Sequence, residues 1–228
     1  MTVEGLAERL ARVREEIARV QAAYGLTQAV GIVAVTKGQP PSAAEAAARA
    51  GLPDVGENRV QEALEKIEAV GAGLRWHLIG HLQTNKAKFV PGRFALVHSL
   101  DSLRLAEALS RAAAKEGAVV PVLVQVNVAR EAQKGGCAPD EAAALVAACR
   151  MLPGLAVRGL MTMAPFTDDE AVQRRVFGDL RTLRDAIATP AHPLPELSMG
   201  MSGDYPAAVA EGATMLRLGT VLFGERTG

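Results

Sequence analysis

Lys37 is the residue whose type and position most clearly suggest chemistry. It ends an otherwise apolar run at residues 31–37, Gly-Ile-Val-Ala-Val-Thr-Lys. A lysine at the end of a buried strand keeps its stem among apolar side chains, and partial burial favours the neutral amine that forms an imine with a carbonyl group. A lysine in this position can also simply reach water. Its position alone therefore leaves both interpretations open.

Two segments near the end of the chain could bind a phosphate group. They are residues 198–204, Ser-Met-Gly-Met-Ser-Gly-Asp, and residues 217–220, Arg-Leu-Gly-Thr. Ser202 can donate its hydroxyl, and the backbone N–H groups around Gly203, Gly219 and Thr220 can surround an anion at the start of a helix near residue 204. The glycines could instead serve only to form turns.

Two other patterns suggest metal or anion binding less well. His77 and His81 are four residues apart, a spacing that places two zinc ligands on one face only in a helix, and residues 76–80 read as a strand and a turn. Lys86 and Lys88, with Asn85, could form an anion patch, but a solvated helix face explains them better. We therefore expect no metal site.

Eight short apolar runs alternate with helical stretches along the chain. Most runs are rich in Val, Leu and Ile and hardly alternate with polar residues, which is typical of parallel strands covered on both faces. A doubly wound sheet would need a glycine-rich turn after the first strand, and none is present. The pattern therefore predicts an α/β fold, a single (β/α)8 TIM barrel. The runs are Val30–Lys37, Asp54–Asn58, Arg75–Gly80, Ala95–Leu100, Val120–Val128, Ala156–Met163, Glu196–Met201 and Thr214–Gly224.

An amphipathic helix precedes the barrel. Its apolar residues are spaced three and four apart and lie on one face, and Gly25 ends it. We expect one barrel domain over residues 1–228, with residues 1–25 as a helix packed on it. The apolar face consists of Val3, Leu6, Leu10, Val13, Ile17 and Val20.

Capping residues predict several helix starts. Ser42 and Glu45 form a capping box after Pro40 and Pro41. Asp101 caps the helix that ends near residue 117, and a proline at 139 opens a later one.

Composition excludes several classes of protein. Hydrophobic residues make up 49% and charged residues 22%, and 25 Lys and Arg balance 25 Asp and Glu, so we expect neither a nucleic-acid nor a membrane partner. Cys137 and Cys149 are too few for a disulfide scaffold. The N-terminus lacks the apolar core of a signal peptide and no run is long enough to span a membrane, so we expect a cytoplasmic protein.

In a barrel of this kind, the active site lies at the C-terminal ends of the strands, and loops after strands seven and eight often bind phosphate. The two glycine-containing segments follow those strands, and Lys37 ends the first one. At this point the motifs resemble the YggS/PROSC family of pyridoxal phosphate homeostasis proteins, in collinear order from residue 34 to 226. The resembling stretches are residues 34–37 (AVTK), 56–62 (GENRVQE), 76–86 (WHLIGHLQTNK), 125–127 (QVN) with 134–136 (KGG), 158–161 (RGLM), 198–202 (SMGMS) and 217–224 (RLGTVLFG).

The resemblance implies a barrel similar to the N-terminal domain of alanine racemase, with pyridoxal 5′-phosphate (PLP) as cofactor. In that pattern, Lys37 forms a Schiff base with PLP. Arg217 lies near the pyridine nitrogen, and Asn58 and His77 line the pocket. The residues that would hold the phosphate are Ser202, Gly203, Gly219 and Thr220.

The same resemblance implies a PLP carrier that acts in PLP homeostasis and delivers PLP to apoenzymes. A fixed cation at the pyridine nitrogen opposes ring protonation and weakens the ring as an electron sink. Racemization also needs acid/base groups on both faces of the substrate carbon. Alanine racemase obtains the second group, a tyrosine, from another domain and subunit, and we expect Tyr24 and Tyr205 of this chain to point elsewhere.

We therefore expect no catalytic residues, no efficient racemase activity and a monomer. A weak single-domain racemase, and a cofactor-free lyase or aldolase that uses Lys37, are the alternatives.

Overall fold

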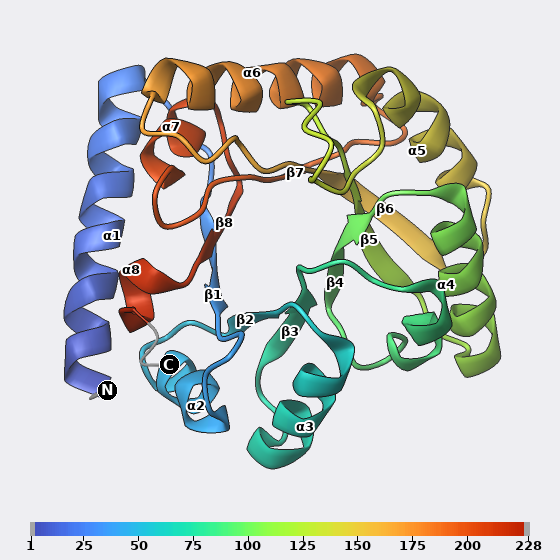
Figure 1. The fold of residues 1–228 in the computed structure, drawn as a ribbon, viewed down its shortest axis with the longest axis horizontal. Coiled ribbons are helices and arrows are strands. Elements are labelled where there is room, and N and C mark those ends of the chain that lie inside the picture. The colour runs from blue at the N-terminus through green and yellow to red at the C-terminus, as the bar shows by residue number, and fades with distance from the viewer. Residues whose placement is uncertain (1–2, 226–228) are drawn as a thin grey trace.

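Eight parallel strands form a closed barrel in sequence order, with β8 paired to β1. The computed structural model describes residues 3–225, with side chains from residue 5 onward. The barrel confirms the predicted fold class, and Figure 1 shows the helices around the strands. The strands are β1 (Gly31–Val35), β2 (Asp54–Glu57), β3 (Arg75–Leu78), β4 (Leu96–Leu100), β5 (Val120–Gln125), β6 (Leu155–Met161), β7 (Glu196–Ser198) and β8 (Met215–Leu218).

One α-helix precedes the first strand and the others come after strands, and together they cover the outside of the barrel. They are α1 (Val3–Tyr24), α2 (Pro41–Arg49), α3 (Val60–Val70), α4 (Leu103–Glu116), α5 (Ala142–Arg150), α6 (Glu170–Ile187), α7 (Tyr205–Ala210) and α8 (Thr220–Phe223). Two 3₁₀ helices, η1 (Thr84–Phe89) and η2 (Pro139–Glu141), complete the connections.

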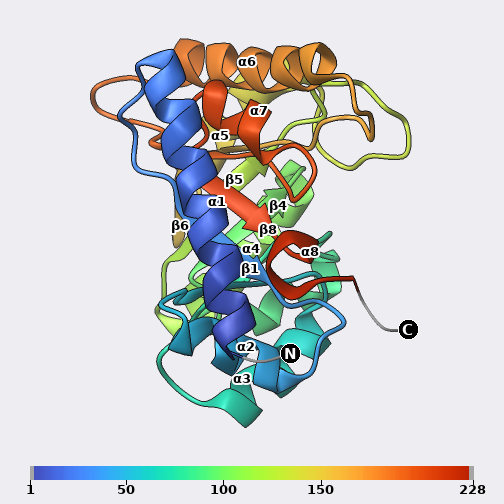
Figure 2. The same ribbon diagram turned by 90° about the vertical axis from the view of Figure 1, so that its left-hand side faces the viewer.

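Helix α1 lies along the outside of the barrel, beside α7 and α8 (Figure 2). The predicted apolar face is buried from Leu6 to Val20. The side chain of Val3 lies outside the described residues. Arg9 donates a hydrogen bond from Nη1 to the carbonyl of Leu222 in α8 (3.1 Å). Gly25 follows the helix with φ of +64°, as expected for a glycine that ends a helix.

Alternate residues of each strand face opposite sides of the barrel wall. Val55, Trp76 and Leu78 face outward and belong to the main apolar core between strands and helices. The neighbouring positions face inward. Leu96, Leu123 and Met161 form a second apolar cluster inside the barrel, packed against Met163 and Met215. Polar side chains occupy much of the remaining interior.

Three predicted boundaries were wrong. Helix α2 begins at Pro41 with Pro40 as its N-cap, because proline suits the first helical position, so Ser42 lies inside the first turn. Ser102 caps α4 by accepting a hydrogen bond from Leu105 N, and Asp101 does not. The last predicted run ends in α8 rather than in a strand. Within residues 3–225, no helix is long and apolar enough to cross a bilayer.

Candidate functional site

Lys37 lies in the turn that directly follows β1 and is half-buried. The backbone on both sides of it is held from behind by helix α3. Lys66 donates from Nζ to the carbonyl of Thr36 (2.7 Å), and Glu62 accepts the N–H of Gly38 (2.6 Å). Gly38 has φ of +68°, a conformation that favours glycine and turns the chain away after the lysine. The turn therefore fixes Lys37 at the C-terminal mouth of the barrel.

The residues that hold this turn form a buried charged group, which we call the outer network: Thr36, Glu57, Glu62 and Lys66. The Thr36 hydroxyl donates to Glu57 Oε1 (2.5 Å), and Lys66 Nζ pairs with Glu57 (2.7 Å) and Glu62 (2.9 Å). Burial raises the pKa of Glu57, although the hydrogen bonds from Lys66 and Thr36 oppose the shift. Burial acts the same way on Glu62, but hydrogen bonds from Lys66 and Gly38 outweigh it and lower its pKa.

The predicted phosphate loops meet Lys37 at the same mouth. Strand pairing sets Ala34 of β1 opposite Leu218 of β8, so Lys37 and Gly219 follow adjacent strand ends. A Cβ built on Gly219 would lie 3.6 Å from Val35 Cβ, which confirms how closely these ends approach.

Ser202 connects the two loops. Its Oγ accepts hydrogen bonds from the N–H groups of Gly219 (3.1 Å) and Val221 (3.2 Å). Thr220 and Val221 form the first turn of α8, where backbone N–H groups lack partners within the helix. Val221 was not predicted, because its contribution is a backbone N–H that the sequence does not reveal. Gly203 is exposed, and no atom lies within 4 Å of a Cβ built on it. Ser202 therefore joins the loop after β7 to the start of α8, and the space beside Gly203 is open.

Arg217 lies inside the barrel just below these loops. It is 4% exposed and donates from Nη1 to Ser198 Oγ (2.7 Å) and from Nη2 to the carbonyl of Thr162 (2.9 Å). Burial lowers its pKa to about 10, partly offset by the negative charge of Asp204. Asp204 is itself buried, which raises its pKa, and it accepts a hydrogen bond from Met201 N (2.5 Å).

Asn58 and His77, which the resemblance places in the cofactor pocket, lie at different depths in the barrel. Asn58 directly follows β2 and is half-buried, so it lies at the mouth with Lys37. His77 points instead toward the opposite end, because its Nε2 lies 3.0 Å from Asp54 Oδ1, at the first residue of β2. Its Nδ1 lies 2.9 Å from His98 Nε2. Both ring nitrogens thus contact protein atoms, and the His77 side chain points away from the mouth at which Lys37 lies.

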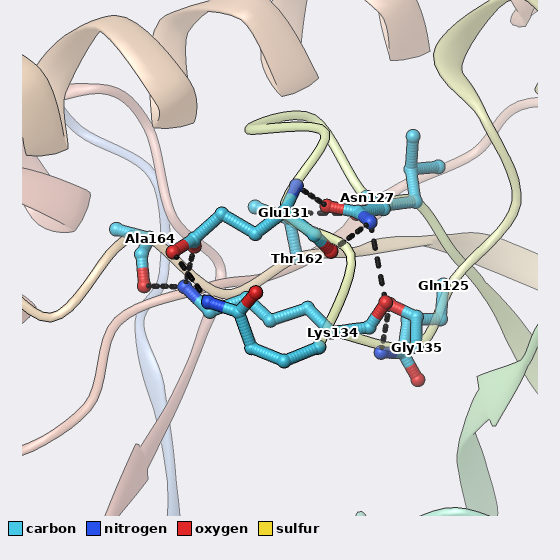
Figure 3. A network of polar contacts seen from close by, with 9 residues as sticks. Gln125, Asn127, Glu131, Lys134, Gly135, Thr162 and Ala164 are labelled. Carbon is cyan, nitrogen blue, oxygen red and sulfur yellow. Dashed lines mark hydrogen bonds and ion pairs between the residues drawn. The ribbon is translucent and has the colours of Figure 1, made fainter.

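A network of polar contacts holds the loop after β5 and joins it to the loop after β6 (Figure 3). The Asn127 side chain donates to the carbonyls of Glu131 (2.8 Å) and Lys134 (3.2 Å) and accepts the N–H of Glu131. Lys134 pairs with Glu131 and donates to the carbonyl of Ala164 in the next loop (2.6 Å). Gly136 has φ of +119°, and an added Cβ would lie 2.7 Å from Asn127 N, so only glycine fits there. The loop is therefore held in one conformation by its own hydrogen bonds and by its contact with Ala164.

Other reactive groups are poorly suited to chemistry. Burial raises the pKa of Cys137 to about 12 and that of Cys149 to about 11, which keeps both thiols protonated. Among the described residues, no cluster of three or more His, Cys, Asp or Glu could hold a metal ion.

Comparison with known proteins identifies the family. The family model of the alanine racemase N-terminal domain matches residues 9–227. The pyridoxal phosphate homeostasis protein of Aquifex aeolicus is 42% identical over 222 residues, 96% of this chain and 97% of that protein. The protein of that name from Pseudomonas aeruginosa is 43% identical over 97% of this chain and 96% of its own.

A solved structure supports the same family assignment. PipY of Synechococcus elongatus, solved with PLP bound, superimposes with a TM-score of 0.84 at 38% identity, covering 96% of this chain and 100% of PipY. The barrel, the motifs and the full-length similarity agree, and the chain belongs to the family of pyridoxal phosphate homeostasis proteins, whose barrel is that of the alanine racemase N-terminal domain.

Proposed function

We propose that this protein binds PLP as a Schiff base on Lys37 and acts in the homeostasis and delivery of PLP without efficient racemase activity. The observation that carries the proposal is the convergence of three groups at one mouth of the barrel. Lys37 can form an imine and the Ser202 loops can hold a phosphate, and Arg217 lies inside the barrel just below them.

The donor set suits a phosphate dianion. Ser202 uses its oxygen to accept two N–H groups, which leaves its hydroxyl proton to donate to a ligand. The N–H of Thr220, the first residue of α8, can add a hydrogen-bond donor at the same mouth, whereas the N–H groups of Gly219 and Val221 bond to Ser202. The open space over Gly203 leaves room for the phosphate oxygens. Asn58 borders the same mouth and can donate a further hydrogen bond from its side chain.

Arg217 supports holding PLP rather than activating it. The guanidinium can only donate hydrogen bonds, so a pyridine nitrogen beside it would accept and stay unprotonated. PLP supplies an electron sink to amino-acid chemistry when its ring is protonated, and a fixed cation at the nitrogen opposes that protonation.

The hydroxyls of the two tyrosines lie beside other groups, away from the position that a second acid/base group would need next to such a cofactor. The Tyr24 hydroxyl at the end of α1 accepts a hydrogen bond from Arg174 Nη1 (2.6 Å) on the outside of the barrel. Tyr205 is close enough to Glu16 and Arg19 of α1 for their charges to act on its hydroxyl, and burial raises its pKa. Neither is placed to serve as a second acid/base group, which supports the non-catalytic proposal.

Absorption spectroscopy tests the proposal. We expect the protein mixed with PLP to develop a visible imine band, which Lys37→Ala abolishes. Lys115→Ala, which removes an exposed lysine in the last turn of α4, is the matched control and should keep the band. A band that survives in Lys37→Ala would place the imine elsewhere. No band in the unmodified protein would favour a cofactor-free use of Lys37, and alanine racemization at ordinary enzyme rates would contradict the carrier role.

Delivery needs a separate assay. The PLP-loaded protein should restore activity to a PLP-dependent apoenzyme faster than the release of PLP into solution allows, which is measured with a PLP-trapping amine present. Reactivation no faster than free release would contradict delivery while leaving PLP binding intact.

A further inference from the structure

A continuous line of hydrogen-bonded side chains crosses the inside of the barrel. It begins at Asp54 on β2 and passes through His77 on β3, His98 on β4 and Ser198 on β7 to Arg217 on β8. The joining distances are 3.0 Å from Asp54 to His77, 2.9 Å between the histidines, 2.8 Å from His98 to Ser198 and 2.7 Å from Ser198 to Arg217. We call these five residues the inner network.

The two ends of the inner network dictate its proton positions. Arg217 can only donate, so Ser198 Oγ accepts from it, and we assign the Ser198 hydroxyl proton to the hydrogen bond with His98 Nδ1, the order that agrees with an ionised acceptor, Asp54, at the other end. Burial lowers the pKa of His98 well below its usual range, and the positive charge of Arg217 acts in the same direction, so His98 is neutral. Its one proton therefore lies on Nε2.

The same logic continues to Asp54. His98 donates from Nε2 to Nδ1 of His77, which is therefore unprotonated, and His77 donates from Nε2 to Asp54. Burial would raise the pKa of Asp54, but hydrogen bonds from Arg75 and His77 outweigh it and hold the carboxyl ionised. Arg75 binds Asp54 with both Nε and Nη2 (2.6 Å each). Every donor then points from Arg217 toward Asp54.

We propose that Ser198, His98, His77 and Asp54 are positioning residues that fix the guanidinium of Arg217 from inside the barrel and thereby set the protonation of the PLP ring nitrogen. This inference rests on the proposed PLP site. Arg217 has two hydrogen-bonded anchors, Ser198 and the Thr162 carbonyl, and only the first can be removed through a side chain. Loss of Ser198 leaves the guanidinium held at one nitrogen and free to rotate away from the ring.

The charges around Arg217 do not provide this control by themselves. Asp204 is the carboxylate whose charge acts on Arg217, and no direct hydrogen bond between them is present in the described part of the chain. Asp54 and Arg75 lie at the far end of the inner network and largely neutralise each other. The orientation of the Arg217 guanidinium therefore comes from the hydrogen bonds of Ser198. Removing them is the sensitive test of the proposal.

The experiment compares Ser198→Ala with Ser110→Ala. Ser110 is also buried and donates one hydrogen bond, to the Pro153 carbonyl (2.7 Å), but lies on α4 outside the barrel. Each protein is loaded with PLP carrying ¹⁵N in its ring, and the nitrogen chemical shift is followed with pH. For Ser198→Ala we expect the ring nitrogen to protonate at higher pH than in the unmodified protein and PLP affinity to fall by about three- to tenfold. Ser110→Ala should change neither.

The proposal would be overturned if the PLP ring nitrogen titrated in Ser198→Ala as it does in the unmodified protein. A visible imine band in both proteins would then show that the PLP site itself stands. Absence of that band from the unmodified protein would instead remove the proposed function.

A second measurement needs no PLP and no core variant. In His81→Gln/His192→Gln, which removes the two exposed histidines, ¹⁵N spectra should show both remaining rings protonated at Nε2, and a proton on either Nδ1 would refute the inner network.

Discussion

Two buried polar networks lie on opposite sides of the barrel wall. One holds the backbone on either side of Lys37, and the other ends at Arg217. The outer network, between the wall and α3, holds the turn of Lys37 through an ion pair of Lys66 with Glu57. The inner network, inside the barrel, reaches Arg217 through the side chains of two histidines and a serine.

The two networks differ in how their groups are satisfied. Each ring nitrogen of His77 and His98 has a partner between 2.8 and 3.0 Å away. In the outer network, Glu57 Oε2 is buried and has no hydrogen-bond partner among the described residues. A buried ion pair is costly to break, because the partner left behind is an uncompensated charge. We therefore expect the outer network to control stability, and the inner one to control how PLP is held.

Lys66→Met should have the largest effect. The substitution leaves Glu57 buried without its counter-ion, so we expect the free energy of unfolding to fall by about 3–5 kcal/mol. Chemical denaturation at neutral pH measures it. Lys115→Met on the exposed end of α4 is the control and should change stability by about 0.5 kcal/mol or less. A loss below about 1 kcal/mol in Lys66→Met would show that the ion pair is not what holds this region.

Ser202→Ala tests the mouth between the two networks. Removal of the hydroxyl takes away a donor to the phosphate and the acceptor for Gly219 and Val221. We expect PLP affinity to fall by about tenfold, with both networks and the imine band retained. Equilibrium titration with PLP gives the affinity, with Ser110→Ala as the reference. Unchanged affinity would remove Ser202 from the phosphate site.

Asp54→Asn gives the smallest expected effect, and it is pH-dependent. The lowered pKa of Asp54 means that its ionised form stabilises the folded state above the unfolded pKa, about 3.9, and that this contribution is lost as pH falls below it. The variant lacks the contribution at every pH. Its stability deficit at pH 7, about 1 kcal/mol or less for a partly exposed ion pair, should therefore shrink below about pH 4.

Denaturation curves at pH 7 and pH 3 measure this deficit. Asp168→Asn, at an exposed position before α6, provides the reference. A deficit that stays constant with pH would mean that Asp54 acts through packing and not through its charge.

The residues at the mouth of the barrel could be predicted because their types stand out in the sequence. Lys37 ends an apolar run, and the glycines around Ser202 and Gly219 interrupt two others. Strand lengths and helix starts were less certain, since the same residues suit either side of a boundary. Ser102 and Asp101, for example, are both good caps, and only the backbone path decides between them.

The inner network could not be predicted in the same way. Its members come from five different strands, and which of them meet depends on the register of barrel closure. His98 gave a weak signal, because a histidine within the run 95–100 needs a partner when buried. Ser198 belongs to a motif attributed to phosphate binding, but the structure turns it inward toward Arg217.

Chemical trapping of the cofactor tests the central claim most directly. The PLP-loaded protein is reduced with borohydride, which makes the imine permanent, and is then digested and mapped by mass spectrometry. We expect the pyridoxyl phosphate group on the peptide that contains Lys37, at close to one group per chain, and its loss in Lys37→Ala. A label carried mainly by another lysine, or no label at all, would contradict the account.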